Sequence, residues 1–379
     1  MDFALTPKQL ELQKMVRDFA QGEVWNTATE REEKHIFDRK LSSKCHEMGI
    51  TQAPFDKKWG GGGMDFMTYM VMLEEICKAD IGLAATISVC TTLYGWPVDN
   101  FGTDAQKERF LKPVMATDKL ACFGLTEPNA GSDAAMQQTV AKKDGDHYII
   151  NGSKKFITNA GEADYIIIFC MTDQSKGLKG ISAFLSETNV PGLRWGKEER
   201  KMGINTSMTR EIFFEDMRVH KDQLLGEEGI GFKIAMQALD GGRISVAGQG
   251  LGIAAQAFDC ALKYTKERVQ FGKPIASNQG LQFMLADMYN LVTTSRLLVQ
   301  KACYLKDNKI PYVLEAAQAK LFAGDAGMKV AIDAIQLHGG HGYTKDYQVE
   351  RLARDAKIVQ IYEGTQQVQR MVVASQLLR

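Results

Sequence analysis

The residue whose surroundings best suit acid–base chemistry is a glutamate near the end of the chain. Glu363 follows an apolar run that ends in Tyr362, and Gly364 comes directly after it. Burial in an apolar pocket disfavours the ionised form of a carboxyl group, so its pKa rises toward the value that suits a general base. The pattern marks Glu363 as a candidate base, although the segment taken alone also fits an exposed glutamate near a helix start.

Three further stretches have the composition of ligand-binding loops. Residues 123–133 place a proline, two glycines and small polar residues after an apolar strand, which is typical of backbone N–H groups presented to an anion or a polar ring. Residues 155–159 put a threonine near an aromatic ring, as a planar cofactor would require. Residues 336–343 contain three glycines that let the backbone approach a phosphate closely. Each stretch alone also fits an ordinary turn or strand end.

Two segments of the C-terminal half combine glycine with arginine. Gly241 and Gly242 lie inside a helical pattern, between Asp240 and Arg243. Each glycine there costs about 1 kcal/mol relative to alanine, so either a ligand or a neighbouring helix approaches the backbone closely. Arg268 precedes a Gly/Pro turn, and its guanidinium group matches phosphate oxygens unless it is simply a solvated helix end.

Neither a disulfide framework nor a metal centre is predicted. The seven cysteines are scattered, odd in number and without a C-x-x-C pair, which indicates reduced thiols in a cytosolic compartment. His338 and His341 are three residues apart, and no third ligand lies near them in the sequence.

The composition is that of an ordinary globular protein. Of the 379 residues, 45% are hydrophobic and 24% are charged, and 46 basic residues balance 46 acidic ones. This balance gives no support for a nucleic-acid or membrane-surface partner, and the length favours two or three domains. No continuous apolar run approaches the roughly 20 residues of a membrane span. The start of the sequence has no leader pattern, so we expect a cytoplasmic protein.

The hydrophobic period changes twice along the chain. Helical signals come first, with a capping box at Thr6 and Gln9 and helices expected around 40–48, 65–79 and 104–115. Strand signals follow at 147–158, 165–171, 180–185 and 211–215, the first interpreted as two strands joined by an Asn151-Gly152 turn. Long helices are expected again at 232–267, 278–306 and 312–337. We therefore expect an α+β protein with boundaries at 1–120, 121–228 and 229–379.

Together and in this order, these stretches resemble the signatures of the acyl-CoA dehydrogenase family over essentially the whole chain. The resemblance implies an N-terminal helical domain, a middle β-domain and a C-terminal four-helix bundle. It implies Glu363 as the catalytic base and FAD as the cofactor. The residues implied at the substrate are Ser132, Asp240, Arg243, Tyr362 and Gly364. Those implied at FAD, partly across a subunit interface, are Phe123, Leu125, Thr126, Gly131, Ser132, Phe156, Ile157, Thr158, Arg268, Phe271, Gln279, Gln336, Leu337, His338, Gly339, Gly340, Thr365 and Gln367.

The position of the base also sorts members of this family. Long-chain and isovaleryl-type members carry it on an earlier helix, where residues 246–251 contain no carboxylate here. The context of Glu363 instead resembles the short-chain, butyryl-CoA-like type. In contrast to the usual pattern, Asn205 and Thr206 replace Arg-Gly, and Gln366 replaces Ser or Asn. The bulk of Leu93, Tyr94 and Trp96 predicts a short acyl pocket, or one whose aromatic side chains stack on a ring-bearing acyl group.

The resemblance also implies partners and leaves the direction of the reaction open. We expect a homotetramer built as a dimer of dimers, with electron-transferring flavoprotein as the electron partner. The same site could instead reduce an enoyl- or aryl-acrylyl-CoA within an electron-bifurcating complex. One further alternative is an acyl-CoA oxidase, which passes electrons to oxygen, although oxidases are usually longer chains. Another is a relative that binds DNA with little dehydrogenase activity, and the net charge of zero argues against it.

Overall fold

The computed structural model describes residues 3–379, and it begins with a set of helices. The capping box forms as expected, because Thr6 Oγ1 accepts from Gln9 N at 3.2 Å and Gln9 Oε1 accepts from Thr6 N at 3.0 Å. The helices of this part are α1 Pro7–Phe19, α2 Trp25–Glu33, α3 Arg39–Glu47, α4 Phe66–Ala79, α5 Ile81–Ser88, α6 Trp96–Phe101, α7 Asp104–Gln106 and α8 Lys112–Ala116.

A continuous helical run, Ile81–Phe101, was not expected from the sequence. Helices α5 and α6 are joined by a π-helical stretch, Val89–Gly95, and nearly every residue of the run is buried. An amphipathic period is therefore missing, which is the signal that identifies most surface helices. By length and composition the run could cross a membrane, but 94% of its apolar window is buried inside the fold, as in a core helix.

The middle of the chain forms a mixed sheet with strand order β6-β7-β3-β2-β4-β5-β8, and β1 pairs in parallel with β4. The strands are β1 Ala121–Gly124, β2 Val140–Asp144, β3 His147–Thr158, β4 Tyr165–Met171, β5 Ile181–Glu187, β6 Leu193–Glu198, β7 Thr209–His220 and β8 Leu224–Leu225. Successive side chains of β4 and β5 point to opposite faces of the sheet, and each face contributes to its own apolar core. One core includes residues of the helices, and the other consists mainly of residues from the strands.

The expected hairpin at Asn151-Gly152 is wrong. Strand β3 runs through both residues, and the hairpin is formed one strand earlier, between β2 and β3 around Gly145. Asn151 instead exchanges hydrogen bonds with Asp216 on β7, while the pairing register shifts between Ile150 and Gly152. The Asn-Gly pair therefore makes a β-bulge, which uses the same backbone freedom of glycine as a turn does.

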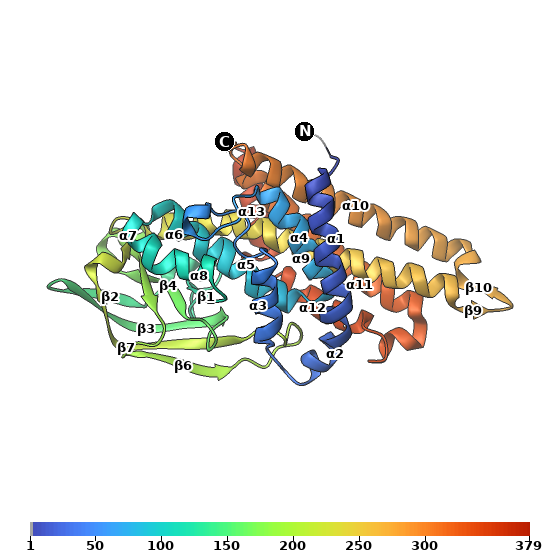
Figure 1. The fold of residues 1–379 in the computed structure, drawn as a ribbon, viewed down its shortest axis with the longest axis horizontal. Coiled ribbons are helices and arrows are strands. Elements are labelled where there is room, and N and C mark those ends of the chain that lie inside the picture. Colours follow the sequence, from blue (N-terminus) through green and yellow to red (C-terminus); the bar gives the residue numbers. More distant parts are fainter. Residues whose placement is uncertain (1–2) are drawn as a thin grey trace.

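The C-terminal part is again helical, with α9 Gly231–Glu267, α10 Gln279–Asp307, α11 Val313–His338, α12 Val349–Val359 and α13 Gln366–Leu377. A side-chain carbon at Gly250 of α9 would lie 2.5 Å from the Ala323 carbonyl oxygen of α11, so glycine permits these two helices to pack closely. The short strands β9 Val269–Gln270 and β10 Lys273–Pro274 form a hairpin after α9. Figure 1 shows this hairpin at one end of the long axis and the sheet at the other.

The order helical, β, helical confirms the fold class expected from the sequence. The three long helices of the C-terminal part also agree with the expected ranges 232–267, 278–306 and 312–337 to within one residue at each end.

Candidate active site

Glu363 lies in the sharp turn between α12 and α13. Its backbone has a positive φ of 51°, and that of Gly364 is 94°. Such angles are uncommon for residues other than glycine and are a frequent sign of a functional constraint. Thr365 ends the turn by capping α13, since its hydroxyl oxygen accepts from Val368 N at 3.2 Å.

Two buried side chains hold the carbonyl groups of this turn. Lys320 of α11 donates to Gly364 O at 2.6 Å and to Gln366 Oε1 at 3.2 Å. Gln369 of α13 donates to Glu363 O at 3.1 Å and to Gly364 O at 3.0 Å. The strained backbone is therefore over-determined by contacts with two neighbouring helices, which leaves the Glu363 carboxylate unengaged by its own turn.

The carboxylate rests against α9. A side-chain carbon added at Gly242 would overlap Glu363 Oε2, and it would lie 2.9 Å from Leu93 Cδ2. Leu93 belongs to the π-helical stretch, so a glycine, a leucine and the glutamate meet at one point. Within residues 3–379, Glu363 Oε2 is buried and has no hydrogen-bond partner. A buried polar atom without a partner is rare and indicates that something else contacts it in the functional state.

The titration behaviour of Glu363 follows from this setting. Burial raises the pKa of its carboxyl group to about 7, and the cations of Arg243 and Lys320 oppose the rise. Burial also lowers the pKa of Lys320 to about 8, although Glu363 favours its charged form. A carboxyl group that ionises near neutral pH is suited to accept a proton.

Of the residues expected at the substrate, Asp240, Arg243 and Tyr362 lie on this side of the site, whereas Ser132 is exposed in the loop after β1. Arg243 donates to Asp240 Oδ1 at 2.6 Å, while its Nε atom is buried without a partner in the described chain. Burial raises the pKa of Asp240, and Arg243 opposes that shift. Tyr362 donates its hydroxyl proton to Gln249 Oε1, and Gln249 in turn donates to Ser88 Oγ at 3.3 Å.

A second group of expected residues lies where strands β1 and β3 end. Lys154 is fully buried and donates to Leu125 O at 3.2 Å, Glu127 Oε1 at 2.7 Å and Gln137 Oε1 at 3.0 Å. Lys155 N also donates to Thr126 O at 2.8 Å. These bonds hold the loop that contains Gly131 and Ser132 against the end of β3.

Side chains of this second group divide by exposure. Phe123, Leu125 and Ile157 are buried in the apolar cores, so a ligand would meet mainly their backbone. Phe156 is 61% exposed at a positive φ of 59°, next to a second register shift of β3, and Thr158 is half-buried. The bulge therefore directs one aromatic ring out of the sheet.

The remaining expected cofactor residues lie elsewhere in the chain. Arg268, Phe271 and Gln279 are exposed on or beside the hairpin β9–β10, remote from the sheet (Figure 1). Gln336, Gly339 and Gly340 are exposed at the end of α11, whereas Leu337 and His338 are buried there. Gln367 is exposed on α13. A single chain does not bring these residues to the ends of β1 and β3.

Sequence reasoning missed the residues whose hydrogen bonds hold the Glu363 turn and the loop after β1 in place. Lys320 and Gln369 were not identified, nor was Lys154. The available signal was a lone lysine in an apolar, alanine-rich helical stretch, because such a charge is rarely fully buried without a purpose. Tyr94 had been expected at the acyl pocket; its side chain is fully buried in the same apolar core as Leu93, and its hydroxyl donates to Phe110 O at 3.1 Å. Among Leu93, Tyr94 and Trp96, Leu93 is the one beside Gly242.

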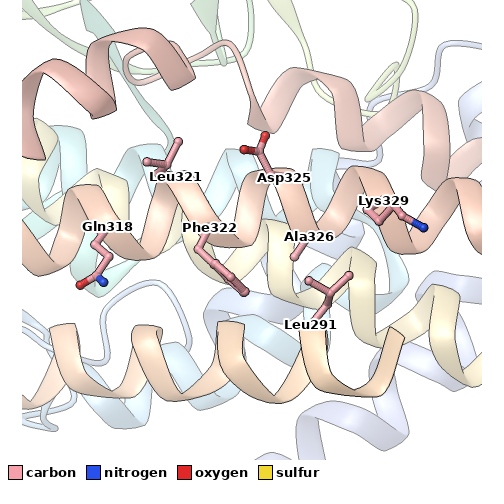
Figure 2. Close-up of a pocket in the computed structure, with 7 residues that line it drawn as sticks. All are labelled: Leu291, Gln318, Leu321, Phe322, Asp325, Ala326 and Lys329. Atoms are coloured by element: carbon pink, nitrogen blue, oxygen red, sulfur yellow. The ribbon is translucent and has the colours of Figure 1, made fainter. Parts of the chain in front are cut away.

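No group of residues within 3–379 has the composition of a metal site. A cavity of about 410 Å³ lies between α10 and α11. Figure 2 shows its lining of Leu291 from α10 and Gln318, Leu321, Phe322, Asp325, Ala326 and Lys329 from α11. Asp325 Oδ1 also accepts from Gln366 Nε2 at 2.9 Å and from Gln360 Nε2 at 2.7 Å, so the cavity wall braces the turn.

Comparison with protein families gives one consistent result. Residues 6–118 match the acyl-CoA dehydrogenase N-terminal domain, residues 122–217 the middle domain and residues 229–378 the C-terminal domain.

Individual relatives are similar over their full length. The chain is 50% identical to a short-chain specific acyl-CoA dehydrogenase of Megasphaera elsdenii, with 100% of both chains covered. It is 44% identical to a 3-(aryl)acrylate reductase of Clostridium sporogenes, with 97% of this chain and 98% of that protein covered.

Solved structures agree with this picture. The structure of butyryl-CoA dehydrogenase from Megasphaera elsdenii matches with a TM-score of 0.98 at 50% identity, over 100% of both chains. A chain from a study of the electron transferring flavoprotein of Acidaminococcus fermentans and flavin-based electron bifurcation matches equally well. The family matches, the identities and the arrangement of the elements together show that this chain belongs to the acyl-CoA dehydrogenase family.

Proposed function

We propose that the protein is an FAD-dependent enzyme that forms, or in reverse reduces, the α,β double bond of a short-chain acyl-CoA, with Glu363 as the base. The observation that carries this proposal is the Glu363 carboxyl group. It is buried against α9 with an unpartnered oxygen atom, and its pKa is raised to about 7. A base at that pKa retains proton affinity, and a substantial fraction of it is ionised near neutral pH.

In the dehydrogenation direction Glu363 removes the proton α to the thioester carbonyl. Within the described chain its own backbone N–H donates to no other group, so it is available to the thioester oxygen, where negative charge develops. Lys320 and Gln369 keep that N–H and the carboxylate in place by fixing the carbonyl groups of the same turn. FAD, when bound, accepts the β-hydrogen as a hydride.

The residues proposed to hold FAD fit a large planar cofactor. Phe156 offers an exposed ring, Thr158 a hydroxyl group and Ser132 an exposed polar side chain. Side-chain carbons added at Gly131 and Gly340 would meet no atom within 4 Å, so packing inside the chain does not require glycine at either position. Close approach of a ligand to the backbone explains both.

Two observations support a short acyl chain: the contact at Gly242 and the names of the relatives. Leu93 Cδ2 lies against the same glycine as the Glu363 carboxylate, so it limits the space beside the base. The relatives with 50% identity are named for short-chain and butyryl-CoA substrates. Each methylene group that fails to fit changes kcat/KM by roughly 10- to 200-fold.

A second candidate is the reduction of an aryl-acrylyl-CoA, favoured by the relative from Clostridium sporogenes. Electron-transferring flavoprotein is the proposed electron partner in both cases, and the match to a chain from an electron-bifurcation study supports the reductive direction. Peroxide formation in air would instead indicate an acyl-CoA oxidase.

The test is anaerobic bleaching of the flavin by a panel of acyl-CoAs, followed by kcat/KM. Butyryl-CoA should exceed octanoyl-CoA and 3-phenylpropionyl-CoA by at least about tenfold, which is the effect of one ill-fitting methylene group. A tenfold preference for 3-phenylpropionyl-CoA would favour the second candidate. Absence of bleaching by every acyl-CoA would contradict the proposal.

Assembly, location and domain boundaries complete the proposal. The hairpin residues Arg268 and Phe271 are exposed and far from the sheet, which supports a homotetramer in which they reach a neighbouring subunit's FAD.

All seven cysteines are free, and six of them are buried, as suits a reducing cytoplasm. We keep domain boundaries near residues 120 and 228, where the helical and strand segments meet.

A further inference from the structure

Lys306, in the last turn of α10, has an environment that the reaction described above does not explain. Its ammonium nitrogen lies 4.9 Å from the ring centroid of Phe66, 5.2 Å from that of Trp96 and 5.1 Å from that of Tyr312. These rings come from α4, α6 and the segment before α11. The ammonium group of a lysine is thus enclosed by aromatic rings from three separate elements.

The ammonium group has few polar partners. It donates to Tyr312 Oη at 3.1 Å. Lys301 on the same helix pairs with Glu315 at 3.4 Å, whereas Lys306 forms no ion pair within residues 3–379. The adjacent Asp307 is turned to the start of α4, where it accepts from Phe66 N at 2.7 Å and Met67 N at 3.0 Å. Of the three donors of the ammonium group, two therefore lack a partner in the chain.

This arrangement has a cost that the fold alone does not recover. Desolvation lowers the pKa of Lys306 to about 8, even though Asp307 and Asp240 favour the charged form. Interactions of the cation with the ring faces offset part of the desolvation. A methionine would fill the same apolar space without that cost, so the retained charge points to an acceptor outside the chain.

The position of the ammonium group identifies that acceptor. A side-chain carbon added at Gly241 would lie 3.5 Å from Lys306 Nζ, and one at Gly242 would overlap Glu363 Oε2. Gly241 and Gly242 are consecutive residues of α9 whose side chains would point in different directions around the helix, so the ammonium group and the carboxylate lie beside adjacent faces of the same turn. In a CoA thioester, the nearest amide is separated from the sulfur by two methylene groups, whereas the phosphates lie at the far end of the pantetheine arm.

We propose that Lys306 is a substrate-binding residue that donates a hydrogen bond to the carbonyl oxygen of the pantetheine amide nearest the thioester. The rings of Phe66, Trp96 and Tyr312 enclose the methylene groups on either side of that amide. Lys306 thereby sets how far the acyl chain enters past Glu363. This inference rests on the proposed function, because it assigns one contact of the same acyl-CoA.

The first experiment compares wild type, Lys306→Met and the control Lys301→Met with three thioesters of increasing length. These are S-butyryl-N-acetylcysteamine, butyryl-pantetheine and butyryl-CoA, assayed with one artificial electron acceptor. A hydrogen bond from a charged donor is strong, so Lys306→Met should raise KM for all three by roughly tenfold or more, with a much smaller effect on kcat. Lys301→Met should match wild type.

The outcomes separate this inference from the function it rests on. Wild type that turns over none of the thioesters would contradict the proposed function itself. An active wild type with unchanged KM values in Lys306→Met would make the lysine a structural brace and overturn the inference alone. A rise in KM confined to butyryl-CoA would place Lys306 at the phosphates and overturn the amide assignment.

A second experiment uses the wild-type holoenzyme and does not depend on the folding of a variant. Its lysines are modified with trinitrobenzenesulfonate and mapped by mass spectrometry, with and without S-butyl-CoA, which lacks the thioester carbonyl and cannot be dehydrogenated. Lys306 should lose its labelling when the analogue is bound, and Lys301 should not. Equal labelling of Lys306 in both samples would overturn the contact.

Discussion

At the scale of single residues, the pKa of Glu363 is influenced by two nearby cations that form their hydrogen bonds with other groups. Arg243 and Lys320 both favour the ionised form of Glu363, yet burial prevails and the pKa of the carboxyl group is raised to about 7. Arg243 is paired with Asp240, and Lys320 donates to the carbonyl group of Gly364. Each cation therefore orients a neighbour of Glu363 and neutralises the carboxylate only in part.

Replacement of Glu363 by glutamine tests its role as the base. The amide keeps the shape of the side chain and cannot accept the α-proton, so Glu363→Gln should bind FAD and butyryl-CoA while kcat falls. Positioned acid–base groups contribute roughly a hundred- to ten-thousand-fold, and the loss should lie toward the upper end. Glu267→Gln, at the exposed end of α9, is the control. A rate within tenfold of wild type would assign the proton transfer to another group.

The raised pKa of Glu363 also predicts the pH dependence. The base is active only when ionised, and its pKa is about 7. In the dehydrogenation direction kcat/KM should therefore level off above about pH 7 and fall about tenfold per pH unit below it. The check is a profile of kcat/KM, with circular dichroism at each pH to show that the fold persists. A flat profile down to about pH 5.5 would mean that Glu363 titrates in the ordinary carboxyl range.

At the scale of elements, the contact between α9 and the Glu363 turn allows a clean test. A methyl group at Gly242 would overlap Glu363 Oε2 and press on Leu93. Gly242→Ala should therefore displace the carboxylate and lower kcat at least about tenfold, because small misplacements of reacting groups are costly. Its Tm should not fall much, since alanine favours a helix by about 1 kcal/mol.

Gly22→Ala is the matched control for that variant, because an added carbon there meets no atom within 4 Å. It should leave kcat unchanged. If Gly242→Ala also retains full kcat, catalysis does not require the contact between the Glu363 carboxylate and α9, and the proposed site geometry is incorrect.

Elements with a clear period were predictable from the sequence. Helices such as α10 and α11 carry their buried residues at helical spacing, and Thr6 and Gln9 formed the expected cap. The run Ile81–Phe101 was missed because a helix that is buried on every side has no polar face to set its period. The Asn151-Gly152 pair was misassigned because glycine serves a bulge as readily as a turn.

The same limit applied to the candidate site. Glu363 could be found because its neighbours in the chain, a tyrosine and a glycine, carry a local signal. Lys320 and Lys306 are recognised by contacts with segments far away in sequence, such as the bond from Lys320 to Gly364 and the approach of Lys306 to the rings of Phe66 and Trp96. A single sequence contains no periodicity or spacing that reports such pairs, so tertiary contacts were needed to identify them.

At the scale of the whole molecule, a buried polar network joins the three parts of the chain. Asn205 donates to Glu32 Oε1 at 2.8 Å, and Thr206 donates to Asp80 Oδ1 at 2.7 Å. Ile204 N donates to Asp355 Oδ1 at 2.6 Å. The unusual Asn205-Thr206 pair is thus explained by contacts from the segment before β7 to helices at both ends of the chain. The sheet is thereby fixed against the helices that carry the base.

The exposed hairpin β9–β10 is the second feature at this scale. The Phe271 side chain is 100% exposed in the single chain, at a positive φ of 51° and before Gly272. A strained turn that presents a bare aromatic ring has no role inside this chain. Burial of a phenylalanine contributes about 1.5–3 kcal/mol, which a neighbouring subunit would provide. We therefore expect the ring to insert into the partner of a tetramer, near its FAD.

Phe271→Asp tests this assembly, because it replaces the apolar anchor with a charge that is costly to bury. Sedimentation velocity should show dissociation of the tetramer, and the FAD content per chain should fall with it. Leu178→Asp, which changes an exposed leucine in the loop between β4 and β5, should preserve both. A Phe271→Asp protein that stays tetrameric with full FAD occupancy would show that the hairpin is not part of the interface. A wild-type monomer with full FAD occupancy would contradict the proposed tetramer directly, since each chain would then bind the cofactor without residues from a neighbour.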